Sequence, residues 1–280
     1  MLQMLSYVCA AERNEFKLMD ILNLSMDSEN CHSDNDVIIR FFGGLSITTN
    51  FGKVLENEFH SNLSVKMLAY LLENRDRRVS KAELVDALWP NNDIDNKQVR
   101  NVAYHIRKTL GDIYPGDLVV SDNMGNYYLD PNVHIMTDTN SFSSHYRLGK
   151  AAVASQKEKV YHLKEAIKLY THDYLPALYG DMWLDNIWTR YRINYFSAVE
   201  ELLPILYAEG VYAELYSISS AALLIEPDRG HILYWHIRAM ISLGAIDMAR
   251  QYYVVHSQEL EENEKKYLLA LFSSSRMTQD

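Results

Sequence analysis

The chain has 280 residues, a mass of 32.5 kDa and 48% hydrophobic residues, enough to fill the cores of two domains, which excludes a disordered chain. Its 27 Lys and Arg against 37 Asp and Glu give a net charge of -10, so binding to a polyanion requires a local concentration of basic residues. The two cysteines exclude a disulfide scaffold, and no apolar run approaches the about 20 residues of a membrane span. No basic segment precedes an apolar stretch at the start, so we expect a cytoplasmic protein with no membrane partner.

Residues 1–36 are expected to form an N-terminal helix followed by the polar linker Ser25–Asp36. This segment has 2 basic and 7 acidic residues, so it is the most acidic part of the chain. Cys31, His32 and Asp34 could begin a metal site, but no second cluster supplies the remaining ligands. We therefore predict no metal site and no cofactor.

Two strands are predicted next, at Val37–Phe42 and Leu45–Thr49, because both stretches are rich in β-branched and aromatic residues. Gly43 and Gly44 form the turn between them. Helical spacing then predicts a helix with one apolar stripe, made of Leu63, Met67, Leu68, Leu71 and Leu72.

A second, short helix is predicted to begin at Ser80, where Ser80 and Glu83 have the S-x-x-E form of a capping box. It is predicted to end at Trp89, because Pro90 disfavours the helical conformation of the residue before it.

A third helix, capped by Asp95 and closed by a left-handed Gly111, is predicted to have two unlike faces. Its apolar face consists of Val99, Val102, Ala103, Ile106 and Leu110, and the opposite face is polar and net basic. A β-hairpin with its turn at Asn123 to Asn126 follows. This order of elements is typical of a winged helix-turn-helix, whose third helix fits a major groove about 12 Å wide.

The candidate DNA-binding residues lie in two groups. On the third helix, Asn101 is the best candidate for adenine recognition. The others on this helix are Lys97, Gln98, Arg100, Tyr104, His105, Arg107 and Lys108, with the basic ones expected at phosphates or a guanine edge. The second group, Arg75, Arg77 and Arg78, could hold phosphates near the N-terminus of the second helix. For both groups the alternative is a solvated surface.

The aromatic residues are expected mainly in packing. Tyr127 and Tyr128 of the hairpin are expected to place one ring inward, and the four tryptophans, Trp89, Trp183, Trp188 and Trp235, to pack in cores or between helices.

Residues 138–280 are predicted to be almost entirely helical, with a repeat of 34 residues that aligns Gly210 with Gly244. This is the tetratricopeptide period. Glycine would permit the tight turn, small residues such as Ala213 and Ala249 would allow close helix approach, and Pro227 would end a unit. The predicted fold is mainly α with a small α+β part: a winged helix-turn-helix domain at 37–137, followed by a tetratricopeptide-like domain at 138–280.

Several motifs support a family assignment. They are Ala87-Leu88-Trp89 with Val99 to Gly111, Asp138 to Phe142, Ala166 to Tyr170 with Asp173-Tyr174-Leu175, Trp188 with Arg190 and Arg192, Ile225-Glu226-Pro227, and Met240 to Tyr252. Together they resemble the OmpR-like winged helix and the bacterial transcriptional activation domain of antibiotic-regulator-type bacterial transcription factors, over about residues 37 to 256. Pro90 and His172 stand where the family usually has Gly, and His105 where it usually has Arg.

The resemblance implies a DNA-binding transcriptional activator whose partners are double-stranded DNA and RNA polymerase. It also implies tandem direct-repeat binding, so a homodimer stays open although the sequence shows no dimer interface. The chain has none of the phosphate-loop, zinc-helix, nucleophile-elbow or dinucleotide motifs, so we predict no catalytic residues. The alternative is a tetratricopeptide-type interaction adaptor that does not bind DNA, which the net charge of -10 favours.

Overall fold

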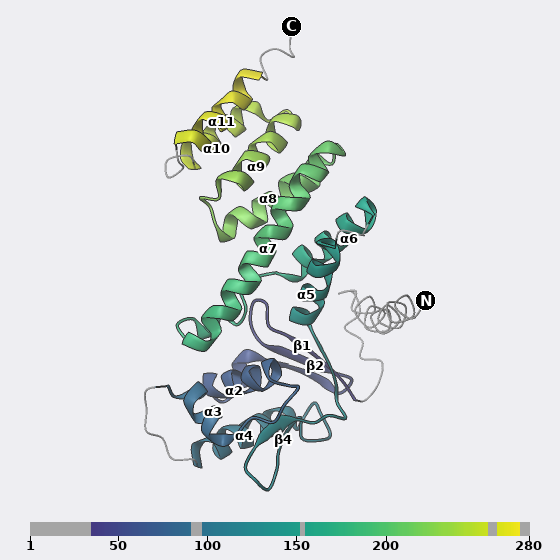
Figure 1. The fold of residues 1–280 in the computed structure, drawn as a ribbon, viewed down its shortest axis with the longest axis vertical. Helices are drawn as coiled ribbons and strands as arrows, with labels where there is room; N and C mark the ends of the chain where they lie inside the picture. The colour runs from purple at the N-terminus through teal and green to yellow at the C-terminus, as the bar shows by residue number, and fades with distance from the viewer. Residues whose placement is uncertain (1–34, 91–96, 152–154, 257–261, 275–280) are drawn as a thin grey trace, which may run out of the picture. The chain divides into compact units, whose positions relative to one another are not determined.

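The computed structural model describes residues 35–90, 97–151, 155–256 and 262–274 (Figure 1). They form two compact units. The first unit consists of residues up to 144 together with 173–188, and the second of residues 145–172 and those from 189 onward. The predicted N-terminal helix, both cysteines and His32 lie outside the described residues.

A four-stranded sheet begins the first unit. Its strands are β1 (Asp36–Arg40), β2 (Ser46–Thr49), β3 (Gly52–Leu55) and β6 (His134–Thr137), in the order β3-β2-β1-β6. β1 pairs antiparallel with β2 and parallel with β6. The first two strands are confirmed. β3 (GKVL) and β6 (HIMT) were not predicted, because neither lies in a run dominated by β-branched and aromatic residues.

Three helices pack beside this sheet: α2 (Asn62–Glu73), α3 (Lys81–Leu88) and α4 (Lys97–Leu110) (Figure 1). A short 3-10 turn, η1 (Glu56–Glu58), precedes them. α2 contacts both α3 and α4, and its Met67 and Leu68 are fully buried. The three predicted helices are therefore confirmed, and burial of the apolar stripe of α2 holds them together.

The start of α3 differs from a reciprocal capping box. The Ser80 hydroxyl accepts a hydrogen bond from the Glu83 backbone N–H (3.2 Å), as predicted. The Glu83 carboxylate, however, accepts from the Tyr70 hydroxyl (2.8 Å) and from the Arg77 guanidinium (2.8 Å) rather than from Ser80. A charged donor gives the stronger hydrogen bond, so Arg77 takes the carboxylate and also lowers the pKa of Glu83.

The end of α4 also differs from the prediction, because Gly111 is not left-handed. Its N–H donates to the Arg107 carbonyl (2.8 Å), and the Tyr114 N–H donates to the Leu110 carbonyl (2.9 Å). The chain thus continues in a right-handed turn beyond the helix. The proposed cap Asp95 lies outside the described residues.

The predicted hairpin is present, with β4 (Val119–Ser121) antiparallel to β5 (Tyr127–Leu129) and Gly125 at a φ of 83° in the turn. Val79 adds a third segment, since Val79 and Tyr127 exchange two backbone hydrogen bonds of 2.8 Å. Tyr127 is buried and Tyr128 half-buried, so only one of the two rings packs inward, as expected. We call the segment from Val119 to Leu129 the wing.

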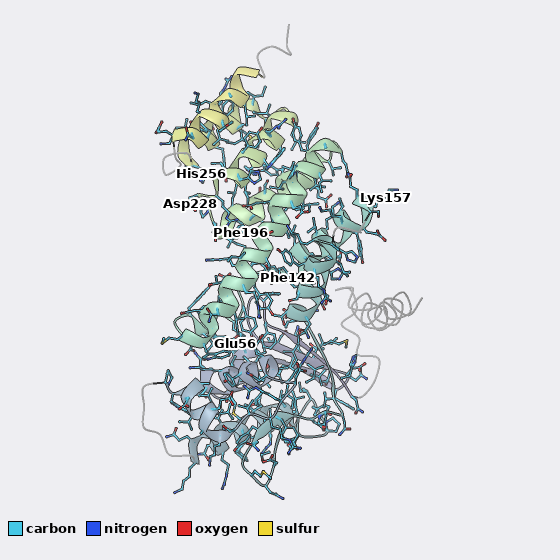
Figure 2. All side chains as sticks on the ribbon, in the orientation of Figure 1. Glu56, Phe142, Lys157, Phe196, Asp228 and His256 are labelled. Atoms are coloured by element: carbon cyan, nitrogen blue, oxygen red, sulfur yellow. The ribbon has the colours of Figure 1, made fainter. Side chains whose placement is uncertain are left out.

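Helices make up the rest of the chain. They are α5 (Asp138–Gly149), α6 (Gln156–Leu169), α7 (Met182–Ala208), α8 (Tyr212–Ile225), α9 (Gly230–Ser242), α10 (Ile246–His256) and α11 (Glu262–Ser274), with a 3-10 turn η2 (Pro176–Leu178) before α7. α5 and α7 each contribute residues to both units. In the second unit Phe196 of α7 is buried (Figure 2). The prediction of a helical C-terminal half is confirmed.

The 34-residue repeat is visible in the backbone hydrogen bonds. In the turns at Gly210 and Gly244, the glycine N–H donates to the carbonyl three residues earlier (3.1 and 3.0 Å). The next N–H donates to the carbonyl five residues earlier (2.9 Å in both turns), and both glycines are left-handed, as in a Schellman motif. α8 and α10 therefore begin at equivalent positions of successive helical hairpins.

Of the two small residues predicted to allow close helix packing, Ala213 and Ala249, only one is buried. Ala249 is fully buried, but Ala213 is exposed, because the residue 34 positions before Ala249 is Leu215. Leu215 is itself fully buried, so a large side chain fills the equivalent site of the earlier hairpin. Pro227 lies just beyond the end of α8, as predicted.

Candidate nucleic-acid interface

The helix α4 has one buried and one exposed face. The predicted apolar residues Val99, Val102, Ala103, Ile106 and Leu110 are all buried. The opposite face consists of Lys97, Gln98, Arg100, Asn101, Tyr104 and Lys108, and all six are exposed. The helix contains four basic residues and no acidic one, so its outer face is a local concentration of positive charge on an acidic protein.

Asn101 lies near the middle of this exposed face. Tyr104, 59% exposed, and Lys108 lie one and two turns further along the same side of the helix. In the described part of the chain, the Asn101 amide makes no side-chain hydrogen bond. Its donor and acceptor are therefore available for the N7 and N6 groups of an adenine.

His105 is only half-exposed, because its ring is stacked on His60, which precedes α2. The ring centroids are 4.1 Å apart and the planes are inclined by 14°. This stack holds the His105 imidazole beside the start of α2 rather than leaving it to extend freely from α4.

The Arg107 side chain forms hydrogen bonds and an ion pair with other residues of the protein. Its Nε donates to the Val119 carbonyl (2.7 Å), an Nη donates to the Ser121 hydroxyl (3.4 Å), and the carboxylate of Asp117 lies 3.7 Å away. Arg107 thus fastens α4 to β4, the first strand of the wing. Since Asp117 follows ten positions later in a loop, helix periodicity could not reveal this role.

The three arginines before α3 do not act as one cluster. Arg77 binds Glu83 and donates to the Asn74 side chain (2.6 Å). Arg75 donates to the Asn140 side-chain oxygen (2.8 and 3.0 Å) in the amide orientation that satisfies both groups. All three remain exposed, but each is oriented by a different neighbour.

Arg78 is the arginine directed to the wing. Its guanidinium donates to the Asp122 carboxylate (3.0 Å) and lies 4.8 Å from the centre of the Tyr128 ring. The Asp122 carboxylate also accepts from the backbone N–H groups of Met124 and Asn126, both at 2.9 Å, and from the Asn126 amide (3.0 Å). These bonds, that from the Asn126 side chain first, lower the pKa of Asp122 and fix the turn.

The sequence interpretation missed the residue at the wing tip. Met124 is 90% exposed, although the backbone on either side of it is held by Asp122. Methionine within a polar turn is a signal that could have been noticed, because such turns usually carry small or polar side chains.

Asp138, the first residue of the family-like motif Asp138 to Phe142, binds backbone N–H groups. Its carboxylate is buried and accepts from the backbone N–H groups of Phe41 (3.0 and 2.9 Å), Phe42 (3.0 Å) and Thr139 (2.8 Å). Burial raises the pKa of Asp138 to about 6 against the opposing effect of these donors. Phe142, one turn later, packs edge-on against Phe42 with centroids 5.5 Å apart (Figure 2).

A second segment of the C-terminal half also belongs to the first unit. Tyr174 is fully buried and stacks on Phe41 at 4.9 Å, and the Leu175 N–H donates to the Phe41 carbonyl (3.0 Å). Asp181 forms an ion pair with the buried Lys66 of α2. Residues 173–188 therefore complete the core around the end of β1.

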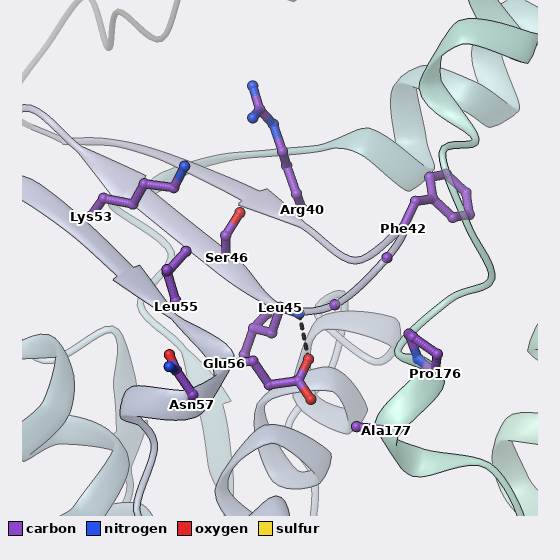
Figure 3. A pocket seen from close by; sticks show the side chains of 12 residues that line it. Arg40, Phe42, Leu45, Ser46, Lys53, Leu55, Glu56, Asn57, Pro176 and Ala177 are labelled. Atoms are coloured by element: carbon purple, nitrogen blue, oxygen red, sulfur yellow. Dashed lines mark hydrogen bonds between the residues drawn. The ribbon is translucent and has the colours of Figure 1, made fainter.

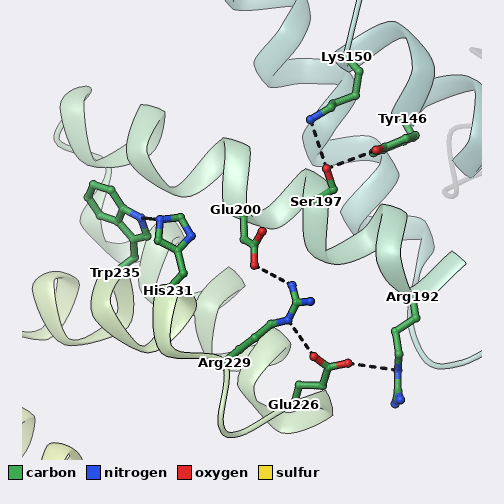
Figure 4. A network of polar contacts seen from close by, with 9 residues as sticks. All are labelled: Tyr146, Lys150, Arg192, Ser197, Glu200, Glu226, Arg229, His231 and Trp235. Carbon is green, nitrogen blue, oxygen red and sulfur yellow. Dashed lines mark hydrogen bonds and ion pairs between the residues drawn. The ribbon is translucent and has the colours of Figure 1, made fainter. Parts of the chain in front are cut away.

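A polar network joins three helices of the second unit (Figure 4). Arg229, just before α9, donates to Glu200 of α7 (2.7 Å) and to Glu226 at the end of α8 (2.8 Å). Arg192 of α7 lies 3.7 Å from Glu226. Two residues of the family-like motifs, Arg192 and Glu226, thus act in helix packing.

A shallow cavity of about 520 Å³ lies in the first unit (Figure 3). Its charged lining residues are Arg40, Lys53 and Glu56, and the Glu56 carboxylate accepts from the Leu45 N–H (2.7 Å).

The described residues contain neither a membrane-spanning helix nor a candidate metal site. No described helix has the length and hydropathy to cross a bilayer. Within those same residues, no three His, Cys, Asp or Glu side chains are grouped so that they could hold a metal ion.

Comparisons with known proteins match both halves of the chain. The family "Transcriptional regulatory protein, C terminal" matches residues 60–125, and the family "Bacterial transcriptional activator domain" matches residues 137–263. Both families are transcriptional regulators rather than enzymes. No curated protein matches significantly.

Among solved structures, Mycobacterium tuberculosis EmbR in complex with a low affinity phosphopeptide has the same fold, with a TM-score of 0.61 and 19% sequence identity. The match covers 87% of this chain and 66% of that chain, so the protein spans just under two thirds of EmbR.

Proposed function

The chain carries the OmpR-like winged helix and the bacterial transcriptional activator domain of an antibiotic-regulator-type transcription factor, and on this basis we propose that it activates transcription by binding double-stranded DNA through α4. Residues 37–137 form the DNA-binding domain in this proposal, and residues 138–280 the activation domain. The protein acts in the bacterial cytoplasm, where the DNA is.

The observation that carries the proposal is the exposed face of α4. It is the face of a 14-residue helix that is free of acidic side chains, and it places Asn101 among Arg100, Tyr104 and Lys108. In the major groove Asn101 would bind an adenine. Gln98 lies about one helical turn before Asn101 and is also exposed. Lys97, Arg100 and Lys108 would neutralise phosphates, each adding about 0.9 to the slope of log affinity against log salt.

Two of the remaining candidates have indirect roles, and the other three would approach the DNA backbone. Arg107 positions the wing through Val119, and Arg78 positions its tip through Asp122. Arg75 and Arg77 stay exposed beside the start of α3 and would contact the phosphate backbone. His105, held by its stack on His60, would approach the DNA backbone rather than a base edge.

For the activation domain we propose a protein-binding surface that contacts RNA polymerase. Exposed apolar side chains on α10 support it: Met248 is 61%, Val254 63% and Val255 65% exposed, and apolar side chains grouped on one surface are typical of protein interaction sites. Met248 and Val255 are seven residues apart and therefore share one side of α10. A second copy of the chain on a direct repeat is another partner that this surface could serve.

The alternative function is an interaction adaptor without DNA binding. Fluorescence anisotropy of the full chain with genomic fragments at two salt concentrations separates the two functions. We expect binding that weakens steeply with salt. Absence of binding at both salt concentrations would favour the adaptor.

The activation surface is tested with the double variant Met248→Asp, Val255→Asp in transcription with purified RNA polymerase. We expect transcription to fall while DNA affinity stays unchanged. Unchanged transcription from the variant would contradict the placement of the contact on α10.

A further inference from the structure

The wing tip combines a rigid backbone with an exposed apolar side chain. Met124 is 90% exposed, and no large hydrophobic side chain of the described residues is more so. The Asp122 carboxylate fixes the turn from both sides, because it accepts from the N–H groups of Met124 and Asn126. Gly125, with a φ of 83°, supplies the backbone conformation that this turn requires.

The turn is also held to other parts of the first unit by hydrogen bonds. Arg78 donates to Asp122 (3.0 Å), Arg107 donates to the Val119 carbonyl (2.7 Å), and Val79 pairs with Tyr127. The wing is therefore held at its base, along one strand and at its tip. A side chain on such a support loses little conformational freedom of the backbone when it binds.

The charge of the wing limits how it can bind DNA. No Lys or Arg occurs between Val119 and Leu129, so the wing cannot insert a cation into the minor groove. Its one acidic residue, Asp122, is paired with Arg78. What the tip offers to DNA is the exposed amide of Asn123 and the thioether of Met124.

Proteins that bind the minor groove frequently insert an apolar wedge such as Met between two base pairs, which partly unstacks that base step and bends the duplex. Pyrimidine–purine steps such as TA yield to this most easily. Resting on the DNA binding proposed above, we propose that Met124 is a wedge that enters the minor groove beside the α4 site and bends the DNA at a flexible step. This wedge makes the wing sensitive to the deformability of a sequence that α4 does not touch.

The experiment uses the full chain and duplexes selected by it from a random-sequence library. A cleavage reagent attached at Asn123→Cys locates the base step that faces the wing. That step is then made TA or AA in otherwise identical duplexes. Affinity is measured by anisotropy, and bending by energy transfer between dyes at the duplex ends.

We expect the wild-type chain to bind the TA duplex about tenfold more tightly than the AA duplex and to bend it. Met124→Ala should abolish most of this difference and of the bend, whereas Met124→Leu should retain both. Because Met124 carries no charge, the salt dependence should stay the same in both variants. Lys108→Ala is the matched control, since it should weaken binding to both duplexes equally.

Equal bending and equal TA preference in Met124→Ala and the wild type would overturn the wedge while leaving DNA binding intact. Loss of binding to both duplexes in equal measure by Met124→Ala would overturn it as well, because it would indicate a contact that ignores deformability. Failure of the wild-type chain to select any duplex would instead refute the proposed function itself.

Discussion

The carboxylate of Asp138 accepts two hydrogen bonds from the backbone N–H of Phe41, at 3.0 and 2.9 Å. Asp138 is the first residue of α5, and Phe41 follows the end of β1, 97 positions earlier in the chain. Their contact ties the beginning of the C-terminal half of the chain to the sheet of the first unit. The first residue of the D-x-x-x-F motif is therefore an anchor for the backbone, and Phe142 packs beside it.

Asp138→Asn should destabilise the first unit by about 1–3 kcal/mol, because an amide NH₂ would face backbone donors that lose their acceptor. The wild type should also have a characteristic pH dependence. Since burial raises the pKa of Asp138 from 3.8 to about 6, the folded state binds the proton more tightly than the unfolded chain. The contribution of Asp138 to stability is thus fully present below pH 3.8 and decreases as pH rises to about 6.

Urea unfolding between about pH 3.5 and 7, which spans that titration, compares the two proteins. The difference in unfolding free energy between wild type and Asp138→Asn should be largest at the acidic end. A difference that grows with pH would contradict the raised pKa.

The buried histidines of the second unit should change stability with pH in the opposite direction to Asp138. The His236 Nδ1 lies 2.9 Å from the Ser219 hydroxyl oxygen, and burial lowers the pKa of His236 from 6.5 to about 4. Burial likewise lowers the pKa of His145 to about 4. The unfolded chain then binds more protons between pH 6.5 and 4, so the second unit should lose stability as pH falls through this window.

His236→Asn should reduce that acid sensitivity, because the amide keeps a polar group near Ser219 but does not titrate. The measurement is the slope of the unfolding free energy against pH, with unfolding followed by tryptophan fluorescence. An identical slope in wild type and His236→Asn would show that His236 is not protonated during acid unfolding.

Tyr174 should be essential for the stability of the first unit although it lies in the C-terminal half of the chain. It is fully buried and stacks on Phe41, so Tyr174→Ala should cost about 3–5 kcal/mol of unfolding free energy. Tyr174→Phe, which keeps the ring, is the control and should be close to wild type. Thermal unfolding of the three proteins checks this, and a stable Tyr174→Ala would mean that residues 173–188 are dispensable for the unit.

Arg107→Ala should uncouple the wing from α4. Loss of the hydrogen bond to Val119 should speed amide exchange in β4 and β5 and lower DNA affinity, with little change in the salt dependence. Lys108→Ala should do the reverse: it should lower the salt slope by about 1 and leave amide exchange unchanged. A drop in salt slope for Arg107→Ala equal to that for Lys108→Ala would show that Arg107 contacts phosphate directly.

The local patterns predicted most of the fold. Runs of β-branched and aromatic residues located β1 and β2, and the two faces of α4 followed from its helical period. The glycines of the 34-residue repeat were also found, because the sequence aligns with itself at that offset, and both are left-handed in the structure.

The predictions were wrong where the local structure depends on contacts that the sequence pattern does not reveal. Glu83 leaves its capping box for Arg77 and for Tyr70 of a different helix, and Gly111 sits in a turn that continues to Tyr114. In the candidate interface, the partner that orients Arg78 is 44 positions away, at Asp122. Such pairings depend on tertiary packing, so spacing along the chain does not contain them.

The central claim is that Asn101 of α4 binds a base edge, and it is tested most directly by Asn101→Ala. Anisotropy titrations compare the variant with the wild type on a selected duplex and on random-sequence DNA at one salt concentration. We expect a loss of about 1–3 kcal/mol on the selected duplex, little loss on random DNA, and a relaxed preference at one base position. Equal losses on both DNAs, or no loss on either, would contradict base recognition by α4.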